Sequence, residues 1–299
     1  MTTEQGAATA VDADTPEVFA ALARKHLPAD IAEQWLRLLR PAAHLRKAGE
    51  GDALVGQLGG LPRLPEDVAW PEWEGCGPLS FVAAVDCAAL LAVGELDIPL
   101  RTDGWLAFFS YDDEEADHLV DAGDPDTWAG ARVLHLPRHY AELPEREAPD
   151  DAYVYRAVPL TVRSGPTAPD LDSAAVDTAF GFEGLPPAAR YDHPVGSEEF
   201  TDALWDLRSG PAHRIGGHAE YVQDAVEEEV ARGALGRDVP WSDPRIAEEA
   251  RRWVLLAQFD TDDDADMMWG DCGVLYWLIR PEDLAANRFE EARLTWQCG

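Results

Sequence analysis

Four short apolar runs, arranged as two pairs, restrict the possible fold more than any other feature of this sequence. They span residues 79–85 and 104–111 in the first half of the chain, and residues 253–259 and 273–279 in the second. Short runs rich in aromatic and branched side chains are typical of strands in the core of a sheet. Strand and helix signals do not alternate strictly. We therefore expect an α+β fold of mixed or antiparallel sheets with flanking helices.

The same order of signals occurs in both halves of the chain. Gly59-Gly60 precedes an apolar run that ends at Asp86, and Gly216-Gly217 precedes a run that ends at Asp260. In each half, a connection then leads to a second run that begins at glycine and has leucine two residues later. Internal duplication is the simplest explanation of such self-similarity. We therefore predict two related halves.

The domain boundaries follow from composition, from helix signals and from this repeat. Residues 1–14 are polar and acidic, and we expect them to form a disordered tail. Residues 15–41 are expected to form a cap of two N-terminal helices, because a Thr-Pro-Glu start opens the first and a proline ends the second. Residues 42–299 are expected to be one domain whose related halves span about residues 42–165 and 210–299.

Weaker patterns complete the expected secondary structure. The second N-terminal helix is expected to cover residues 30–40, where apolar side chains recur at helical spacing. Further strands are expected at residues 132–136 and 153–162, and further helices at residues 197–207, 221–234 and 244–251.

Charge excludes several classes of partner. The chain has 57 acidic and 24 Lys or Arg residues, so its formal net charge is −33. Nucleic acid and anionic membrane surfaces would repel such a protein. Neutral or cationic ligands, or a protein with a basic patch, are the partners that this charge favours. An acidic surface also keeps a protein dispersed in solution, and this simpler role remains an alternative.

Cysteine usage and the N-terminus indicate a cytoplasmic protein. The N-terminal residues contain no apolar segment typical of a signal peptide, and the apolar runs are too short to span a membrane. The cysteines Cys76, Cys87, Cys272 and Cys298 lie too far apart for a paired zinc motif. We expect free thiols in a reducing compartment.

Several segments of the sequence resemble the signatures of the YwqG-like family of bacterial proteins. The resemblance covers about residues 58–298. Its motifs are Leu58 to Pro65, Trp70-Pro71, Pro78 to Asp86, His213 to Gly217, Trp253 to Asp260 and Met268 to Gly273. It implies a duplicated α+β fold of unknown function, with an immunity or interaction role suggested for some members. No catalytic residues follow from it. We therefore expect a non-catalytic protein-binding module, of which an immunity-type protein is one form.

An enzyme or small-molecule binder is the alternative. The sequence motifs of hydrolases, Walker loops and dinucleotide-binding sites do not occur. In this alternative, the site would lie in a cleft between the two halves. Acidic and imidazole groups that could serve it are Asp86, Asp260, His213 and His218, and its walls would carry Trp70, Trp73 and Trp269. The simpler interpretations are that the aspartates bind turns and that the tryptophans cap the core.

Two segments carry histidines or aspartates that are spaced like the ligands of known metal sites. His135 and His139 lie four residues apart, but Pro137 between them disfavours the helix that would align them. In residues 260–271, carboxylates recur as in a calcium loop, and the candidate ligands are Asp260, Asp262, Asp264 and Asp271. Ala265 stands where such a loop needs glycine. A solvated acidic connection without bound metal is therefore the expected state, with weak calcium binding as the alternative.

Overall fold

The computed structural model describes residues 15–112, 120–208 and 210–299, so the expected disordered tail at residues 1–14 lies outside the described residues. The α-helices are α1 Pro16–His26, α2 Ala29–Leu36, α3 Cys87–Ala92, α4 Ala174–Phe180, α5 Ala188–Tyr191, α6 Glu198–Trp205, α7 Val226–Leu235, α8 Arg245–Ala250 and α9 Pro281–Ala285. The strands are β1 Arg40–Lys47, β2 Gly56–Leu58, β3 Glu72–Trp73, β4 Gly77–Pro78, β5 Ser80–Asp86, β6 Trp105–Ser110, β7 Ala131–Leu136, β8 Val158–Thr167, β9 Arg214–Ile215, β10 Val254–Asp260, β11 Val274–Ile279 and β12 Arg293–Gln297. The 3-10 helices are η1 Pro125–Gly130, η2 Arg138–Glu142, η3 Pro194–Gly196 and η4 Phe289–Glu291.

One large antiparallel sheet replaces the expected separate sheets. Its strand order is β12-β11-β10-β9-β1-β8-β2-β5-β6-β7, and β3 and β4 form a separate two-stranded ribbon. The α+β class is confirmed. From the β12 edge inward the order is β12, β11, β10, β9, and from the β7 edge inward it is β7, β6, β5, β2, so the strand numbers fall on both sides. The two series meet at the centre, where β1 pairs with β8. Each central strand then pairs with a strand that is distant from it in the sequence: β1 with β9, and β8 with β2.

The two glycine pairs occupy matching places in this sheet. Gly59-Gly60 follows β2 and Gly216-Gly217 follows β9, and all four glycines have positive φ angles. The Gly59 amide donates to the Val82 carbonyl, and the Gly216 amide donates to the Leu256 carbonyl. Both acceptors lie at a bulge, in β5 and β10 respectively. A side chain on Gly217 would lie 2.6 Å from Thr167 Oγ1, so glycine is required there.

A buried aromatic group fills the space between the two sides of the curved sheet. Phe108 on β6 packs against Phe259 on β10 and Trp277 on β11, with ring centroids 5.1 and 5.3 Å apart. At the edge strand β7, His135 stacks on Phe289 of η4. The sheet therefore closes almost completely around its own core, and apolar side chains occupy its interior.

The outer faces of the apolar strands are covered as well. Helices α7 and α8 cover β10 and β11, where Tyr276 and Leu278 are buried. On the other side, segments around Leu64 and Tyr140 cover β5 and β6. Because both faces are buried, these strands appear in the sequence as continuous apolar runs rather than alternating ones.

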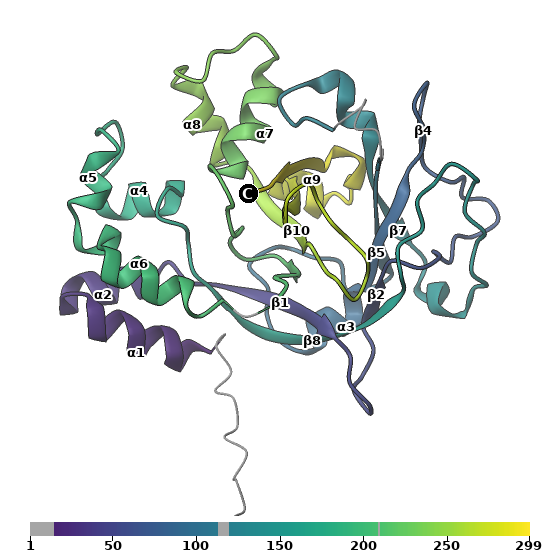
Figure 1. Ribbon diagram of the computed structural model, residues 1–299, viewed down its shortest axis with the longest axis horizontal. Coiled ribbons are helices and arrows are strands. Elements are labelled where there is room, and N and C mark those ends of the chain that lie inside the picture. Colours follow the sequence, from purple (N-terminus) through teal and green to yellow (C-terminus); the bar gives the residue numbers. More distant parts are fainter. Residues whose placement is uncertain (1–14, 113–119, 209) are drawn as a thin grey trace, which may run out of the picture.

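Five helices form a separate cluster at one end of the molecule. We call α1, α2, α4, α5 and α6 the helical cluster (Figure 1). Trp35 of α2 packs edge-on against Phe200 of α6, with ring centroids 5.1 Å apart, and Phe19 of α1 completes the contact. The two helices of the expected N-terminal cap therefore pack together with α4, α5 and α6, which lie between β8 and β9 in the sequence. Strands β1 and β8 run side by side from this cluster into the sheet (Figure 1).

Several expected boundaries were wrong. The second N-terminal helix ends at Leu36 rather than at residue 40, and Arg40 begins β1 instead, because proline at the next position disfavours a helical conformation before it. The helix expected at residues 221–234 begins only at Val226, and the strand expected at residues 153–162 is β8, from Val158 to Thr167. No helix within the described residues is long and apolar enough to cross a membrane.

Candidate functional site

A cleft of about 450 Å³ lies between the helical cluster and the part of the sheet that holds β9. Apolar side chains of α6 form one wall, including Phe200 and Leu204. Its polar lining includes Asp170, Arg208, His213, Arg214 and Glu220, and Trp205 stands at the rim. We call this space the cleft.

The turn after β9 fixes the floor of the cleft to the helical cluster. The His218 amide donates to Thr167 Oγ1 at 2.8 Å, and the Thr167 hydroxyl donates to the Arg40 carbonyl at 3.0 Å. His218 Nε2 donates to the Leu38 carbonyl at 2.8 Å. Burial, reinforced by the nearby Arg40 charge, lowers the pKa of His218 from 6.5 to about 3. His218 is therefore a neutral structural donor at physiological pH.

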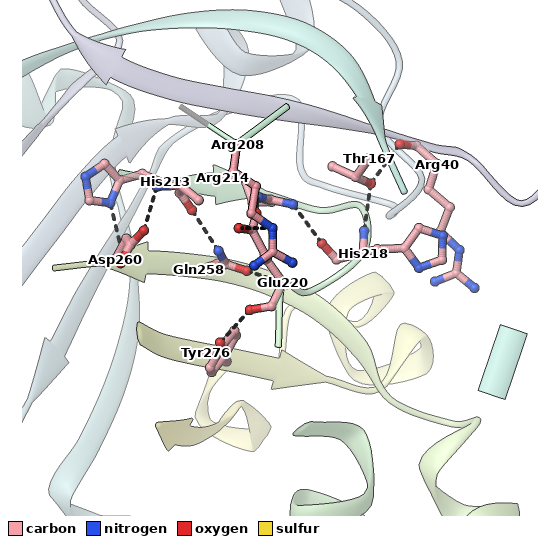
Figure 2. Close-up of polar contacts among 11 residues, drawn as sticks. Arg40, Thr167, Arg208, His213, Arg214, His218, Glu220, Gln258, Asp260 and Tyr276 are labelled. Atoms are coloured by element: carbon pink, nitrogen blue, oxygen red, sulfur yellow. Dashed lines mark hydrogen bonds and ion pairs between the residues drawn. The ribbon is translucent and has the colours of Figure 1, made fainter. Parts of the chain in front are cut away.

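A fully buried glutamine joins the chain before β9 to the chain after it. Gln258 on β10 donates through Nε2 to the Ala212 carbonyl and accepts the Glu220 amide at Oε1, both at 2.9 Å. Tyr276 on β11 donates its hydroxyl to the Glu220 carbonyl at 2.6 Å. Figure 2 shows these bonds holding the backbone on both sides of the turn. The position of Glu220 is therefore set by the sheet.

Glu220 forms ion pairs with two arginines of different exposure. Arg214, whose side chain is 9% exposed, bonds Glu220 Oε2 and also donates to the His218 carbonyl at 3.1 Å. Arg208 Nε lies 3.1 Å from Glu220 Oε1, and its side chain is 34% exposed. The Arg208 guanidinium also lies over the Trp205 ring, 4.1 Å from the centroid.

Both ring nitrogens of His213 are occupied. Nδ1 accepts the Asp260 amide at 3.1 Å, which leaves the proton on Nε2, and Nε2 donates to Asp262 Oδ2 at 3.0 Å. This hydrogen bond lowers the pKa of Asp262. The Asp260 carboxylate accepts the Ala212 amide at 2.9 Å, and burial raises its pKa. Both ring nitrogens of His213 therefore hold neighbouring protein groups, and neither is left to contact a substrate.

Asp170 is the second carboxylate of the cleft. It accepts the Asp172 amide at 3.0 Å, and burial raises its pKa although Arg208 acts in the opposite direction. Together Asp170 and Glu220 can accept hydrogen bonds from a cationic group, with an indole face beside them. The arrangement suits recognition of a cation better than covalent catalysis.

The structure brings some of the expected site residues together and separates others. His213 and Asp260 share one network, and His218 belongs to the same turn but points to Leu38. Asp86 caps α3 by accepting the Ala88 and Ala89 amides. The tryptophans lie elsewhere in the core: Trp70 against Phe109, Trp73 against Tyr111 and Trp269 against Tyr155.

Sequence reasoning missed Trp205, Arg208, Arg214 and Glu220. Arg214 and Glu220 flank the second glycine pair, and this density of polar residues around a turn was a usable signal. Trp205 and Arg208 had no such signal, because their role depends on where the end of α6 lies relative to β9.

The aspartates of the proposed calcium loop contact other groups. Asp262 accepts from His213 and from the Ala265 amide, and Asp264 lies 2.8 Å from Lys47 Nζ. Asp271 is exposed. Among the residues that the structure describes, no group of three or more His, Cys, Asp or Glu side chains is arranged to hold a metal ion, and this includes His135 and His139. A loop without bound metal stays the prediction, with weak calcium binding as the alternative.

Comparison with known proteins gives a family. A sequence profile described as a domain of unknown function, DUF1963, matches residues 56–298. The chain belongs to the DUF1963 family. No curated protein matches the chain at a significant level. The DUF1963 match contains all residues that hydrogen-bond around the turn after β9 except Leu38 and Arg40, and β1 and helices α1 and α2 precede it.

We expect His218 to make the protein less stable in mild acid. The unfolded chain binds a proton on this histidine below pH 6.5, and the folded protein does so only near pH 3, so the free energy of unfolding falls as the pH is lowered through this window. Between pH 7.5 and 5.5, wild type should lose about 1.4 kcal/mol relative to His218→Gln. Urea unfolding at both pH values measures this difference. His139→Gln, at an exposed position, is the control, and equal losses in all three proteins would contradict the prediction.

We expect the acidic loop not to bind calcium at millimolar concentration, because His213 already donates a hydrogen bond to Asp262 and Lys47 already forms an ion pair with Asp264. Calorimetric titration with calcium, and separately with magnesium, should give no saturable heat and no rise in melting temperature. Saturable heat that disappears in Asp264→Asn would contradict this expectation and would support the loop as a weak metal site.

Proposed function

We propose that this protein is a non-catalytic module that binds a basic partner protein. The formal net charge of −33 gives it a long-range attraction for cationic surfaces and a repulsion from nucleic acid and anionic membranes. The acidic residues of the cleft supply a local point of contact. An immunity-type role is one form of this proposal, and it rests on the YwqG-like resemblance alone.

The proposal rests mainly on one observation: the two histidines beside the cleft already form hydrogen bonds within the protein. His213 bonds the backbone through one nitrogen and Asp262 through the other, and His218 bonds the Leu38 carbonyl. A general base needs a nitrogen or oxygen within reach of the substrate proton. Groups that are already committed to holding the backbone favour a rigid binding surface over a reaction centre.

Three finer inferences support the same picture. The signature blocks at residues 58–86 and 253–273 favour the YwqG-like branch of such domains. The mirrored strand order, the matching glycine turns and the matching bulges favour an internal duplication. The four cysteines, all within the described residues, are free thiols, which favours the reducing cytoplasm.

A small-molecule binder is the second candidate. The volume of the cleft, about 450 Å³, lies within the range of ligand pockets, and apolar and polar side chains both line it. This candidate differs from our earlier expectation in its location, because none of Trp70, Trp73, Asp86 and Trp269 lines this cleft. A metabolite that raises the melting temperature of the pure protein at stoichiometric concentration would favour it.

Copurification from the native host, followed by affinity measurement with the purified partner, tests the proposed function. We expect one stoichiometric partner of basic surface, bound at least tenfold more weakly at 500 mM than at 50 mM salt, because screening weakens attraction between charged surfaces. The replacement of sodium chloride by an equal osmolarity of sucrose is the control. A partner whose affinity does not depend on salt, or turnover of a defined metabolite by the pure protein, would contradict the proposal.

A further inference from the structure

The geometry of the cleft points to the chemistry of the partner. We propose that the cleft receives the guanidinium group of an arginine side chain on the basic partner, and that Arg208 occupies this position when the partner is absent. This inference rests on the proposed function, since it names the group by which the partner is recognised. Arg208 is then an internal stand-in for the ligand.

The position taken by Arg208 has the features of a guanidinium site. The charged plane lies over the Trp205 indole at 4.1 Å from the centroid, and Nε lies 3.1 Å from Glu220 Oε1. Stacking on an aromatic face together with an ion pair to a carboxylate is the combination that guanidinium forms better than ammonium. Asp170 lines the same cleft and provides a further acceptor.

The acceptor is held by the sheet, whereas Arg208 is more exposed. Glu220 is fixed through its amide by Gln258 and through its carbonyl by Tyr276, and its second carboxylate oxygen is bound to the buried Arg214. Arg208 lies beyond the end of α6 and its side chain is 34% exposed. Water reaches this partly exposed ion pair and weakens it, so a competing arginine can displace it.

The surroundings favour an arginine that comes from a protein. Trp205 is 64% exposed and Tyr191 is 61% exposed, and both stand at the rim of the cleft. Exposed aromatic side chains around a charged centre are typical of protein interfaces. The net charge of −33 attracts a basic surface before the specific contact forms.

Calorimetric titration of the full chain with a hexa-arginine peptide tests this inference. We expect Arg208→Ala to tighten binding by roughly fivefold, because the exposed ion pair that competes with the peptide is removed. Arg37→Ala removes the same charge from an exposed position at the end of α2, and it should change the affinity much less. This control separates displacement of the stand-in from the general effect of a more negative protein.

A second pair of variants tests the aromatic contact. Trp205→Ala should weaken hexa-arginine binding by roughly fivefold and hexalysine binding hardly at all, because stacking favours the planar guanidinium. Glu220→Gln should weaken both peptides, whereas Glu199→Gln, at an exposed position on α6 away from the cleft, should leave both nearly unchanged. Thermal melting identifies any variant that is unfolded, and the exposed positions of Trp205 and Arg208 keep the test interpretable.

The outcomes separate this inference from the proposed function. If Arg208→Ala and Arg37→Ala behave alike, or if Trp205→Ala weakens both peptides equally, the inference is wrong even where the native partner binds with strong salt dependence. If no variant binds hexa-arginine, the inference is also wrong. The proposed function fails separately, when the native partner shows no salt dependence.

Discussion

The pairing of β1 with β8 is the interaction on which the rest of the structure depends. These strands run antiparallel with Ala43 opposite Ser164, and each continues into the opposite half of the sheet. If β1 and β8 were absent, β9 would lose its neighbour β1 and β2 would lose its neighbour β8. The two sides of the sheet would then not be joined. The aromatic contact of Phe108 with Trp277 can then form only because the sheet is continuous and curved.

The same pair positions the cleft. The helices before β1 and after β8 meet in the helical cluster, because the start of β1 lies beside the end of β8 (Figure 1). Hydrogen bonds from Thr167 to Arg40 and from His218 to Thr167 and Leu38 attach the turn after β9 to this junction. Gln258 then fixes Glu220 opposite α6. The position of the proposed site therefore follows from the pairing of β1 with β8 at the centre of the sheet.

The sequence predicted most clearly the strands that are buried on both faces, and it also indicated β7 and, with shifted bounds, β8, which are only partly buried. Continuous apolar runs identified β5, β6, β10 and β11. β1 was missed because its apolar centre is flanked by Arg40 and Lys47, and β9 because it has only two residues. Of the cleft, His213 and Asp260 were predicted as candidates because they stand next to recognisable motifs. Arg208 could not be, since its contact with Glu220 depends on how an inserted helix packs on the sheet.

Native-state amide hydrogen exchange tests most directly whether the central strands support the whole fold. The Leu45 amide donates to the His213 carbonyl across β1 and β9, and it reports on the centre of the sheet. We expect the amides of β1 and β8 to exchange only through global unfolding, with the same free energy as those of β5 and β10. Exchange of β1 and β8 at a clearly lower free energy, while β5 and β10 stay protected, would contradict this account.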